Sequence, residues 1–183
     1  MRNGFDAEFE ITDIIDDIRH YFATNGSKDT KAIIGISGGK DSTIAAALLV
    51  RALGNDRVIG VMMPDGDQKD IADAHAVCEY LHIKNYTINI KYTTASFIED
   101  IERNTDLLPN GAVHTNMPAR VRMTTLYNVA AMIGGRVINT GNKSEAFVGY
   151  TTKYGDLAGD YAVLRDYYVT EIYKIGDALN LPE

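Results

Sequence analysis

The sequence predicts an α/β protein whose mostly parallel sheet is covered by helices on both faces. Short apolar runs alternate with segments of helical periodicity along most of the 183 residues. Such apolar runs suit parallel strands, which are buried on both faces. The length fits one domain, and the hydrophobic fraction of 45% is enough for a layered core. We therefore expect residues 1–183 to form a single three-layer α/β/α domain of Rossmann-like architecture.

The first half of the chain predicts an opening helix and three strand–helix units. Apolar residues at spacings of three and four, from Phe9 to Phe22, indicate an amphipathic helix over about 6–24 that ends at Asn25 and Gly26. Strands are expected where short apolar or β-branched runs are bounded by turn residues, at about 31–36, 57–63 and 85–90. The helices that follow them are expected at about 41–53, 69–81 and 94–103.

The second half predicts a long helix, a strand and a final helix. The long helix is expected at about 117–133, where Gly134 and Gly135 terminate it. A strand at about 136–139 follows, then a loop-rich stretch at 140–160 and a helix at about 169–179.

Composition and charge exclude several classes of function. The net charge of −7 argues against general nucleic-acid binding. No apolar run is long enough to cross a membrane, and the N-terminus, Met1 to Asp6, has no apolar signal core. The single cysteine, Cys78, excludes an intrachain disulfide, so we expect a cytoplasmic protein.

The most informative segment lies between the first predicted strand and its helix, and reads Ser37-Gly38-Gly39-Lys40-Asp41-Ser42. The two glycines let the backbone pass close to a bulky anion, with a positive φ where one is needed. N–H groups of the turn and the helix dipole would point at that anion, and the two serines add hydroxyl donors. A phosphate repels Asp41 unless a divalent cation lies between them, which favours a Mg²⁺-nucleotide over a simple anion. The alternative is a tight turn around a water molecule or a stray sulfate.

This segment resembles the pyrophosphate loop of the ATP pyrophosphatase superfamily, whose members cleave ATP between the α and β phosphates and adenylate a substrate. It is not a Walker A loop, because Asp41 follows Lys40 and Ile34 holds the place of the first glycine. Ligands of open parallel sheets bind outside the carboxyl ends of the strands. Since the glycine loop, the Pro64 loop and the Thr140-Gly141-Asn142 loop all follow predicted strands, we expect them to converge on one site.

Two further segments narrow the resemblance. The first, which opens the long helix, is Asn116-Met117-Pro118-Ala119-Arg120-Val121-Arg122. The second, after the next strand, is Asn139-Thr140-Gly141-Asn142-Lys143-Ser144-Glu145, followed by Gly149-Tyr150-Thr151-Thr152-Lys153-Tyr154-Gly155-Asp156. With the glycine loop, they resemble NAD synthetase of the ammonia-dependent, single-domain type, from about residue 30 to about 160. The resemblance implies ATP-dependent amidation of deamido-NAD (nicotinic acid adenine dinucleotide) through an acyl-adenylate, with Mg²⁺ as cofactor and ATP as co-substrate. Free ammonia is the expected nitrogen donor, because 183 residues leave no room for a glutaminase domain.

The resemblance also implies roles for individual residues. Asp41 and Glu145 would hold Mg²⁺, and Lys40 with the loop amides would stabilise charge on the departing pyrophosphate. ATP is expected to contact Ser37, Gly38, Gly39, Asp41, Ser42, Gln68 and Thr140. Deamido-NAD is expected to contact Arg120, Lys153, Asp156 and Asp160. Asp156 is also our candidate acceptor for the proton that ammonia loses.

The charge around the second motif suits a polyanionic ligand. Residues 114–153 contain five basic side chains and one acidic one, although chance clustering on solvated faces is an alternative. Arg120 and Arg122 are two residues apart, so they cannot share one helix face. One is expected to face the ligand and the other to pack, pair or extend into water, and the resemblance gives Arg120 the ligand.

The sequence departs from the family's pattern after Asp160. Val163 occupies the place of a proline, and Val169 that of a lysine that contacts ATP phosphates. The chain also ends where family members continue with a segment that closes over the active site. Two alternatives stay open: a truncated or degenerate homologue that binds ATP without synthesis, and an adenylating enzyme that acts on a different acceptor. The resemblance further implies a homodimer, for which the helix at 117–133 is either an interface or ordinary core packing.

Overall fold

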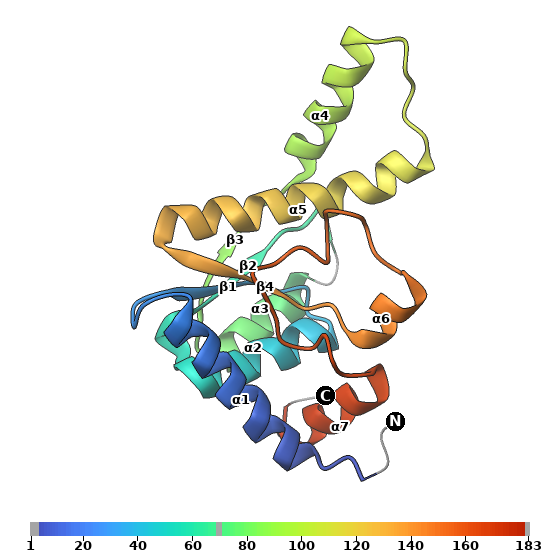
Figure 1. Cartoon of the computed structure of the whole chain (residues 1–183). Helices are drawn as coiled ribbons and strands as arrows, with labels where there is room; N and C mark the ends of the chain where they lie inside the picture. Colours follow the sequence, from blue (N-terminus) through green and yellow to red (C-terminus); the bar gives the residue numbers. More distant parts are fainter. Residues whose placement is uncertain (1–3, 69–70, 182–183) are drawn as a thin grey trace.

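In the computed structural model, which describes residues 4–68 and 71–181, a five-stranded sheet has the order β3-β2-β1-β4-β5 with every pair parallel (Figure 1). Its strands are β1 (Lys31–Gly35), β2 (Val58–Met62), β3 (Lys84–Thr87), β4 (Gly135–Asn139) and β5 (Tyr161–Ala162). The predicted parallel sheet is confirmed, and β5 is a strand that the sequence analysis did not predict.

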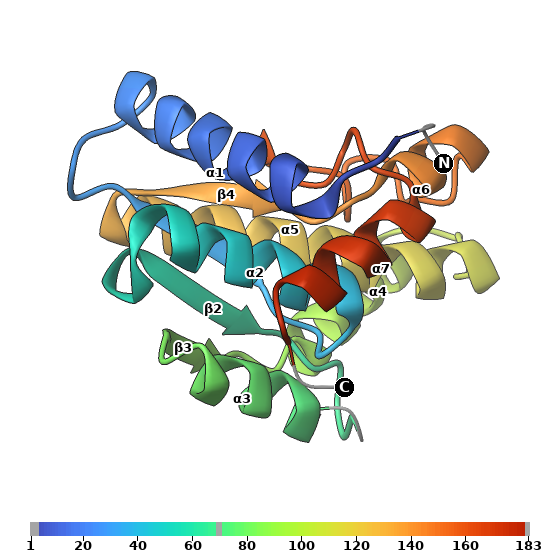
Figure 2. The same cartoon turned by 90° about the horizontal axis from the view of Figure 1, so that it is seen from below.

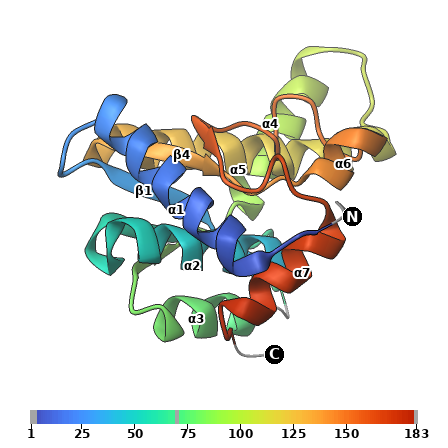
Figure 3. The same cartoon turned by 60° about the horizontal axis from the view of Figure 1, so that its bottom comes forward.

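Helices cover both faces of the sheet, which confirms the α/β/α prediction. One face carries α1 (Ala7–Thr24), α2 (Lys40–Leu53), α3 (Ile71–Tyr80) and α7 (Val169–Ala178) (Figures 1 and 2). The other face carries α5 (Gly111–Ile133), against which α4 (Lys91–Asn104) packs. A short 3-10 turn, η1 (Asn55–Arg57), connects α2 to β2. On the first face, α1 and α7 lie side by side over α2 (Figure 3).

Adjacent residues of β1 show why the sheet needs both layers. Ile34 belongs to the buried apolar cluster that includes Ile18 of α1 and Leu48 of α2, whereas Ile33 belongs to a second cluster that includes Val121 of α5. Both isoleucines are fully buried. A strand that buries every side chain reads as a continuous apolar run, which is why the sequence pattern predicted a parallel strand here.

The helix α5 begins at Gly111, earlier than the predicted start near 117. The side chain of Asn110 caps its first turn by accepting a hydrogen bond from the Val113 N–H at 3.2 Å. Pro118 therefore lies inside the helix rather than at its start. A proline there removes one backbone hydrogen bond, and packing such as that of buried Val121 allows the helix to continue through it.

The stretch at 140–160, predicted as loop-rich, contains the short helix α6 (Lys143–Val148). A capping box starts it: Asn142 Oδ1 accepts from the Glu145 N–H, and Glu145 Oε2 accepts from the Asn142 N–H, both at 3.0 Å. The helix predicted at 69–81 is seen from Ile71 to Tyr80, and its expected start at 69–70 lies outside the described residues. Among the described helices, none has the length and apolar character that crossing a membrane requires.

Candidate active site

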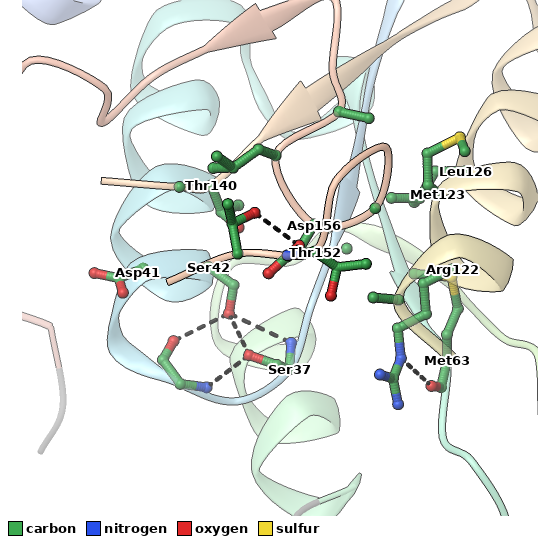
Figure 4. A pocket seen from close by; sticks show the side chains of 18 of the residues that line it. Ser37, Asp41, Ser42, Met63, Arg122, Met123, Leu126, Thr140, Thr152 and Asp156 are labelled. Atoms are coloured by element: carbon green, nitrogen blue, oxygen red, sulfur yellow. Dashed lines mark hydrogen bonds between the residues drawn. The ribbon is translucent and has the colours of Figure 1, made fainter. Parts of the chain in front are cut away.

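A cavity of about 790 Å³ lies at the carboxyl ends of β1, β2 and β4 (Figure 4). The glycine loop after β1, Pro64 after β2, and Thr140 and Gly141 after β4 all line it. The predicted convergence of these three loops is confirmed. The volume is in the range of pockets that enclose small organic ligands.

The glycine loop is held in place by the hydroxyls of Ser37 and Ser42, which lie 3.1 Å apart. Ser42 Oγ donates to the Gly39 carbonyl at 3.0 Å and accepts from the Ser37 N–H at 3.3 Å, while the Gly39 N–H donates to Ser37 Oγ at 3.2 Å. Helix α2 starts directly after this loop, and its N-cap residue, Gly39, has no side chain to cap the first N–H groups. These N–H groups, together with the helix dipole, form a site suited to an anion such as a phosphate.

Gly38 has a conformation and a packing that favour glycine. Its φ is +80°, in the region that side-chain-bearing residues rarely adopt. A Cβ at this position would lie 2.9 Å from the Ala74 backbone nitrogen and 2.9 Å from Asp73 Cβ, both in α3. The loop is therefore wedged against the start of α3, and Gly38, although expected to contact ATP, is not among the residues that line the cavity.

Asp41 and Glu145 line the cavity and are connected through Asn142. Asp41 Oδ2 accepts from Lys40 Nζ at 2.9 Å and from Asn142 Nδ2 at 3.4 Å, and the Asn142 N–H donates to Glu145 Oε2. The other oxygen, Asp41 Oδ1, is buried without a hydrogen-bond partner. A buried carboxylate oxygen in this state is costly, and a cation bound beside it would remove that cost.

This arrangement fits Mg²⁺, which prefers oxygen ligands and is typically bound through one or two carboxylates plus phosphate oxygens and water. The described residues contain no group of three or more His, Cys, Asp and Glu side chains that could hold a metal ion by themselves. Asp41 and Glu145 would therefore share the ion with a phosphate-bearing ligand.

The loop at 150–158 forms the side of the cavity that faces α5, and Asp156 fixes its shape. Asp156 Oδ1 accepts from Thr151 Oγ1 at 3.0 Å and from the Thr152 N–H at 2.7 Å. Thr152 Oγ1 in turn donates to Asn116 Oδ1 at 2.9 Å. The hydrogen bond from Thr152 to Asn116 joins the segment at 149–156 to the segment that opens the long helix, so both contribute to one wall.

Of the two arginines in the second motif, Arg122 lines the cavity and Arg120 does not. Arg122 Nε donates to the Met63 carbonyl at 3.0 Å, whereas Arg120 is exposed and its Nε donates to the Lys153 carbonyl at 3.3 Å. Burial lowers the pKa of Arg122, and the negative charge of Asp65 partly offsets this. Sequence reasoning did not assign Arg122 to the site, although helical periodicity gives the signal: the α5 residues that line the cavity form one face, namely Thr115, Asn116, Ala119, Arg122, Met123 and Leu126.

The structure brings most of the expected site residues together at this cavity, which is lined by Ser37, Gly39, Lys40, Asp41, Ser42, Gln68, Thr140, Glu145 and Asp156. Arg120, Lys153 and Asp160 are not among the residues that line it. Lys153 Nζ lies 5.0 Å from the centre of the Tyr154 ring. Asp160 Oδ2 accepts from the Val137 N–H at 2.7 Å, and its own N–H donates to the Val137 carbonyl at 2.8 Å. Asp160 thus forms two hydrogen bonds with the main chain of β4 at Val137.

The fold and the cavity define a class of protein: a nucleotide-binding α/β protein with its anion site at a strand–glycine loop–helix junction and a carboxylate pair beside it. Within this class, the chain belongs to the NAD synthase family, whose family model matches residues 10–183. The expectation of an NAD synthetase relative is confirmed.

Individual relatives agree with this assignment. An NH3-dependent NAD(+) synthetase from Pyrococcus horikoshii is 40% identical over 170 residues, which cover 93% of this chain and 64% of that protein. The chain thus spans just under two thirds of this relative's length. The solved structure of an NH3-dependent NAD synthetase from Campylobacter jejuni superposes with a TM-score of 0.86 at 31% identity, over 97% of this chain and 75% of that one. An NMN synthetase structure from Francisella tularensis gives a TM-score of 0.87 at 28% identity, over 97% of this chain and 72% of that one.

Proposed function

We propose that the protein makes NAD by ATP-dependent amidation of deamido-NAD with ammonia, and releases AMP and pyrophosphate. The observation that carries the proposal is that the glycine loop, Asp41 and Glu145 line one cavity. The two carboxylates are connected there by hydrogen bonds to Asn142. Family membership and the NH3-dependent synthetases among the relatives support the substrate and the nitrogen donor.

In the proposed first step, the nicotinate carboxylate of deamido-NAD attacks the α-phosphorus of ATP and pyrophosphate leaves. The N–H groups at the start of α2, with Ser37 and Lys40, bind the departing pyrophosphate. Asp41 and Glu145 would hold Mg²⁺, and the bound ion would supply positive charge to offset that of the triphosphate. Because the substrate supplies the nucleophile, the protein contributes positioning and charge stabilisation rather than a nucleophilic side chain.

In the second step, ammonia attacks the acyl-adenylate and displaces AMP. Asp156 lines the cavity, and its carboxylate is our candidate to accept the proton that ammonia loses. Since Asp156 Oδ1 already accepts two hydrogen bonds from its own loop, we assign the proton to Oδ2. Gln68 follows β2 and Thr140 follows β4, the two strands on either side of β1. Both line the cavity and would bind the nucleoside part of ATP.

Arg120, Lys153 and Asp160 lie outside the cavity lining, so in this proposal they contact the distal part of deamido-NAD. We propose a cytoplasmic homodimer in which the exposed apolar side chains of α4, α5 and their connection lie at the subunit interface; these include Tyr92, Phe97, Leu107, Leu108 and Met132. Figure 1 shows α4 standing away from the sheet, where a second subunit has access to it. Burying such side chains is the usual source of stability for a permanent dimer.

A pyrophosphate-release assay tests the proposal. The purified protein is incubated with ATP, Mg²⁺ and ammonia, with and without deamido-NAD, and the products are separated by chromatography. Release that requires deamido-NAD and yields NAD and AMP in equal amounts is expected. ATP binding without release would instead favour a nucleotide-binding homologue, and ADP with phosphate would contradict the assignment.

Two further arms of the assay define the substrates. Replacing ammonia with glutamine is expected to abolish NAD formation, since no residue of the proposal supplies a glutaminase nucleophile. Replacing deamido-NAD with nicotinate mononucleotide tests a different acceptor. Turnover with the mononucleotide alone would show that the acceptor was assigned wrongly while the chemistry was right.

A further inference from the structure

Arg122 is the feature of the cavity that the resemblance left without a role. It extends from α5 on the side of the cavity away from Asp41, and Ser37 and Ser42 lie between the two in Figure 4. Its anchor is the Met63 carbonyl, directly after β2. In the sheet register Gly35 is opposite Val61, so Met63 lies at the level of Ser37 on the neighbouring strand. Neighbouring strands are about 4.8 Å apart, which places the Arg122 anchor beside the first residue of the glycine loop.

The surroundings of Arg122 are largely apolar. Met63, Met123 and Leu126 line the cavity with Arg122, and a Cβ built on Gly35 would be in van der Waals contact with the side chains of Met63 and Leu126, at 3.4 Å and 3.7 Å. Within residues 4–68 and 71–181, only Nε of the Arg122 guanidinium has a hydrogen-bond acceptor, and that acceptor is an uncharged carbonyl. Asp65 is the carboxylate whose charge acts on it.

An arginine cannot escape the cost of burial by losing its proton. The other two nitrogens of the partly buried Arg122 guanidinium have no acceptor among the described residues, so a bound anion is the partner that stabilises them best. Lys40, the other described cation that lines the cavity, is already paired with Asp41 at 2.9 Å. Since the proposed function assigns Lys40 to the pyrophosphate, Arg122 is the cationic side chain of the described lining that is left for a second anionic group.

We propose that Arg122 binds an oxyanion at the reacting end of the nucleotide, either the α-phosphate of ATP or the carboxylate that attacks it. This inference rests on the proposed function, because it places the pyrophosphate end of ATP on the glycine loop. The α-phosphate then lies next to that end, toward the middle of the cavity, and the attacking carboxylate lies next to the α-phosphate. A planar guanidinium suits both groups, because each presents two oxygens to its paired N–H donors.

Pairs of ligands that differ by one anionic group test this role. Dissociation constants for adenosine and AMP report on the α-phosphate, and those for NAD and deamido-NAD report on the carboxylate. The variants are Arg122→Gln and Arg122→Lys, and Arg103→Gln is the control because Arg103 lies on the exposed surface of α4 and pairs with Glu99. Thermal unfolding of each variant is recorded alongside.

We expect Arg122→Gln to weaken AMP relative to adenosine, or deamido-NAD relative to NAD, by about ten- to a hundredfold, as for a lost hydrogen-bonded charge pair. The pair that responds identifies the anion. Arg122→Lys keeps the charge but not the two-pronged geometry, so a smaller loss in the same pair is expected. Arg103→Gln is expected to leave both ratios unchanged.

An equal loss for all four ligands would overturn the inference, because it would mean that Arg122 only holds the end of β2 through the Met63 carbonyl. Unchanged ratios in both variants would overturn it as well. Failure of the proposed function has a different signature: the wild-type protein itself would then bind adenosine as tightly as AMP and deamido-NAD no better than NAD. If Arg122→Gln does not fold, the ratios measured with Arg122→Lys decide.

Discussion

Replacing Gly38 by alanine tests whether the glycine loop is fixed by its contact with α3. The φ of +80° is unfavourable for alanine by about 1–2 kcal/mol. The new Cβ would also lie 2.9 Å from the Ala74 nitrogen and 2.9 Å from Asp73 Cβ, atoms that cannot rotate away because they are part of, or bonded to, the α3 backbone. Overpacking of this kind costs about 1–3 kcal/mol. We therefore expect Gly38→Ala to lower the free energy of unfolding by about 2–5 kcal/mol.

Urea denaturation at 25 °C measures this loss, and two glycine variants separate its parts. Gly134 has a φ of +70°, and no heavy atom lies within 4 Å of the position that a Cβ would occupy, so Gly134→Ala should show the backbone part alone, about 1–2 kcal/mol. Gly39 has a negative φ of −80°, and its Cβ would meet only Ser37 Oγ, at 3.3 Å. Gly39→Ala is expected to cost the least of the three.

The difference between Gly38→Ala and Gly134→Ala isolates the contact with α3. Equal losses in these two variants would refute the reasoning that the loop is wedged against α3. Gly38→Ala should also weaken binding of Mg·ATP, because the loop must shift to relieve the contact, whereas Gly134→Ala, at the far end of α5, should not.

Two further predictions concern Asp41 and Cys78. Asp41→Asn is expected to weaken binding of Mg·ATP at least about tenfold. The melting temperature of the metal-free protein should stay equal or rise, because the buried oxygen without a partner no longer carries charge. Titrations of ATP with and without Mg²⁺ check the first expectation, and an unchanged dependence of ATP binding on Mg²⁺ would contradict it. Burial raises the pKa of Cys78 from 9.0 to about 11, so the folded state keeps a proton that the unfolded state loses. The free energy of unfolding should therefore fall as the pH rises from about 9 to about 11, by up to about 3 kcal/mol from this residue. Urea denaturation at pH 8, 9.5 and 11 should show that Cys78→Ala removes this part of the slope, and parallel pH curves for the two proteins would contradict the prediction.

The parts of the fold that were predictable are those specified by local sequence. β1, the glycine loop and α2 follow from an apolar run, two glycines and a helical pattern that all agree. The order of the strands was not predictable in this way, because it depends on contacts between distant segments such as Ile34 with Ile138. The parallel direction was nevertheless clear, since each strand pair is separated by a helix.

The short elements of the second half were missed because tertiary contacts stabilise them. β5 consists of Tyr161 and Ala162, which pair only with the end of β4, and a two-residue strand leaves no pattern. α6 did leave a signal: Asn142 and Glu145 have the spacing of a capping box. The sequence analysis assigned Glu145 to Mg²⁺, and its Oε2 is at the same time part of the helix cap.

The site shows where motif-based prediction is strong and where it is weak. Most of the residues expected in the glycine loop and after β2 and β4 line one cavity, because parallel topology forces loops at one sheet edge to meet. On α5 the resemblance favoured Arg120, yet helix geometry directs Arg122 into the cavity. Residues such as Asp160, whose carboxylate binds the Val137 N–H, can have a structural role in the isolated chain that no motif reveals.

The most direct test of the central claim is a crystal structure with Mg²⁺ and an ATP analogue that has a methylene group between the α and β phosphates. The account predicts that the β and γ phosphates lie at the N–H groups of Lys40, Asp41 and Ser42, with oxygens of Asp41 and Glu145 about 2.1 Å from the ion. Phosphates bound elsewhere, or a metal ion without either carboxylate, would contradict it.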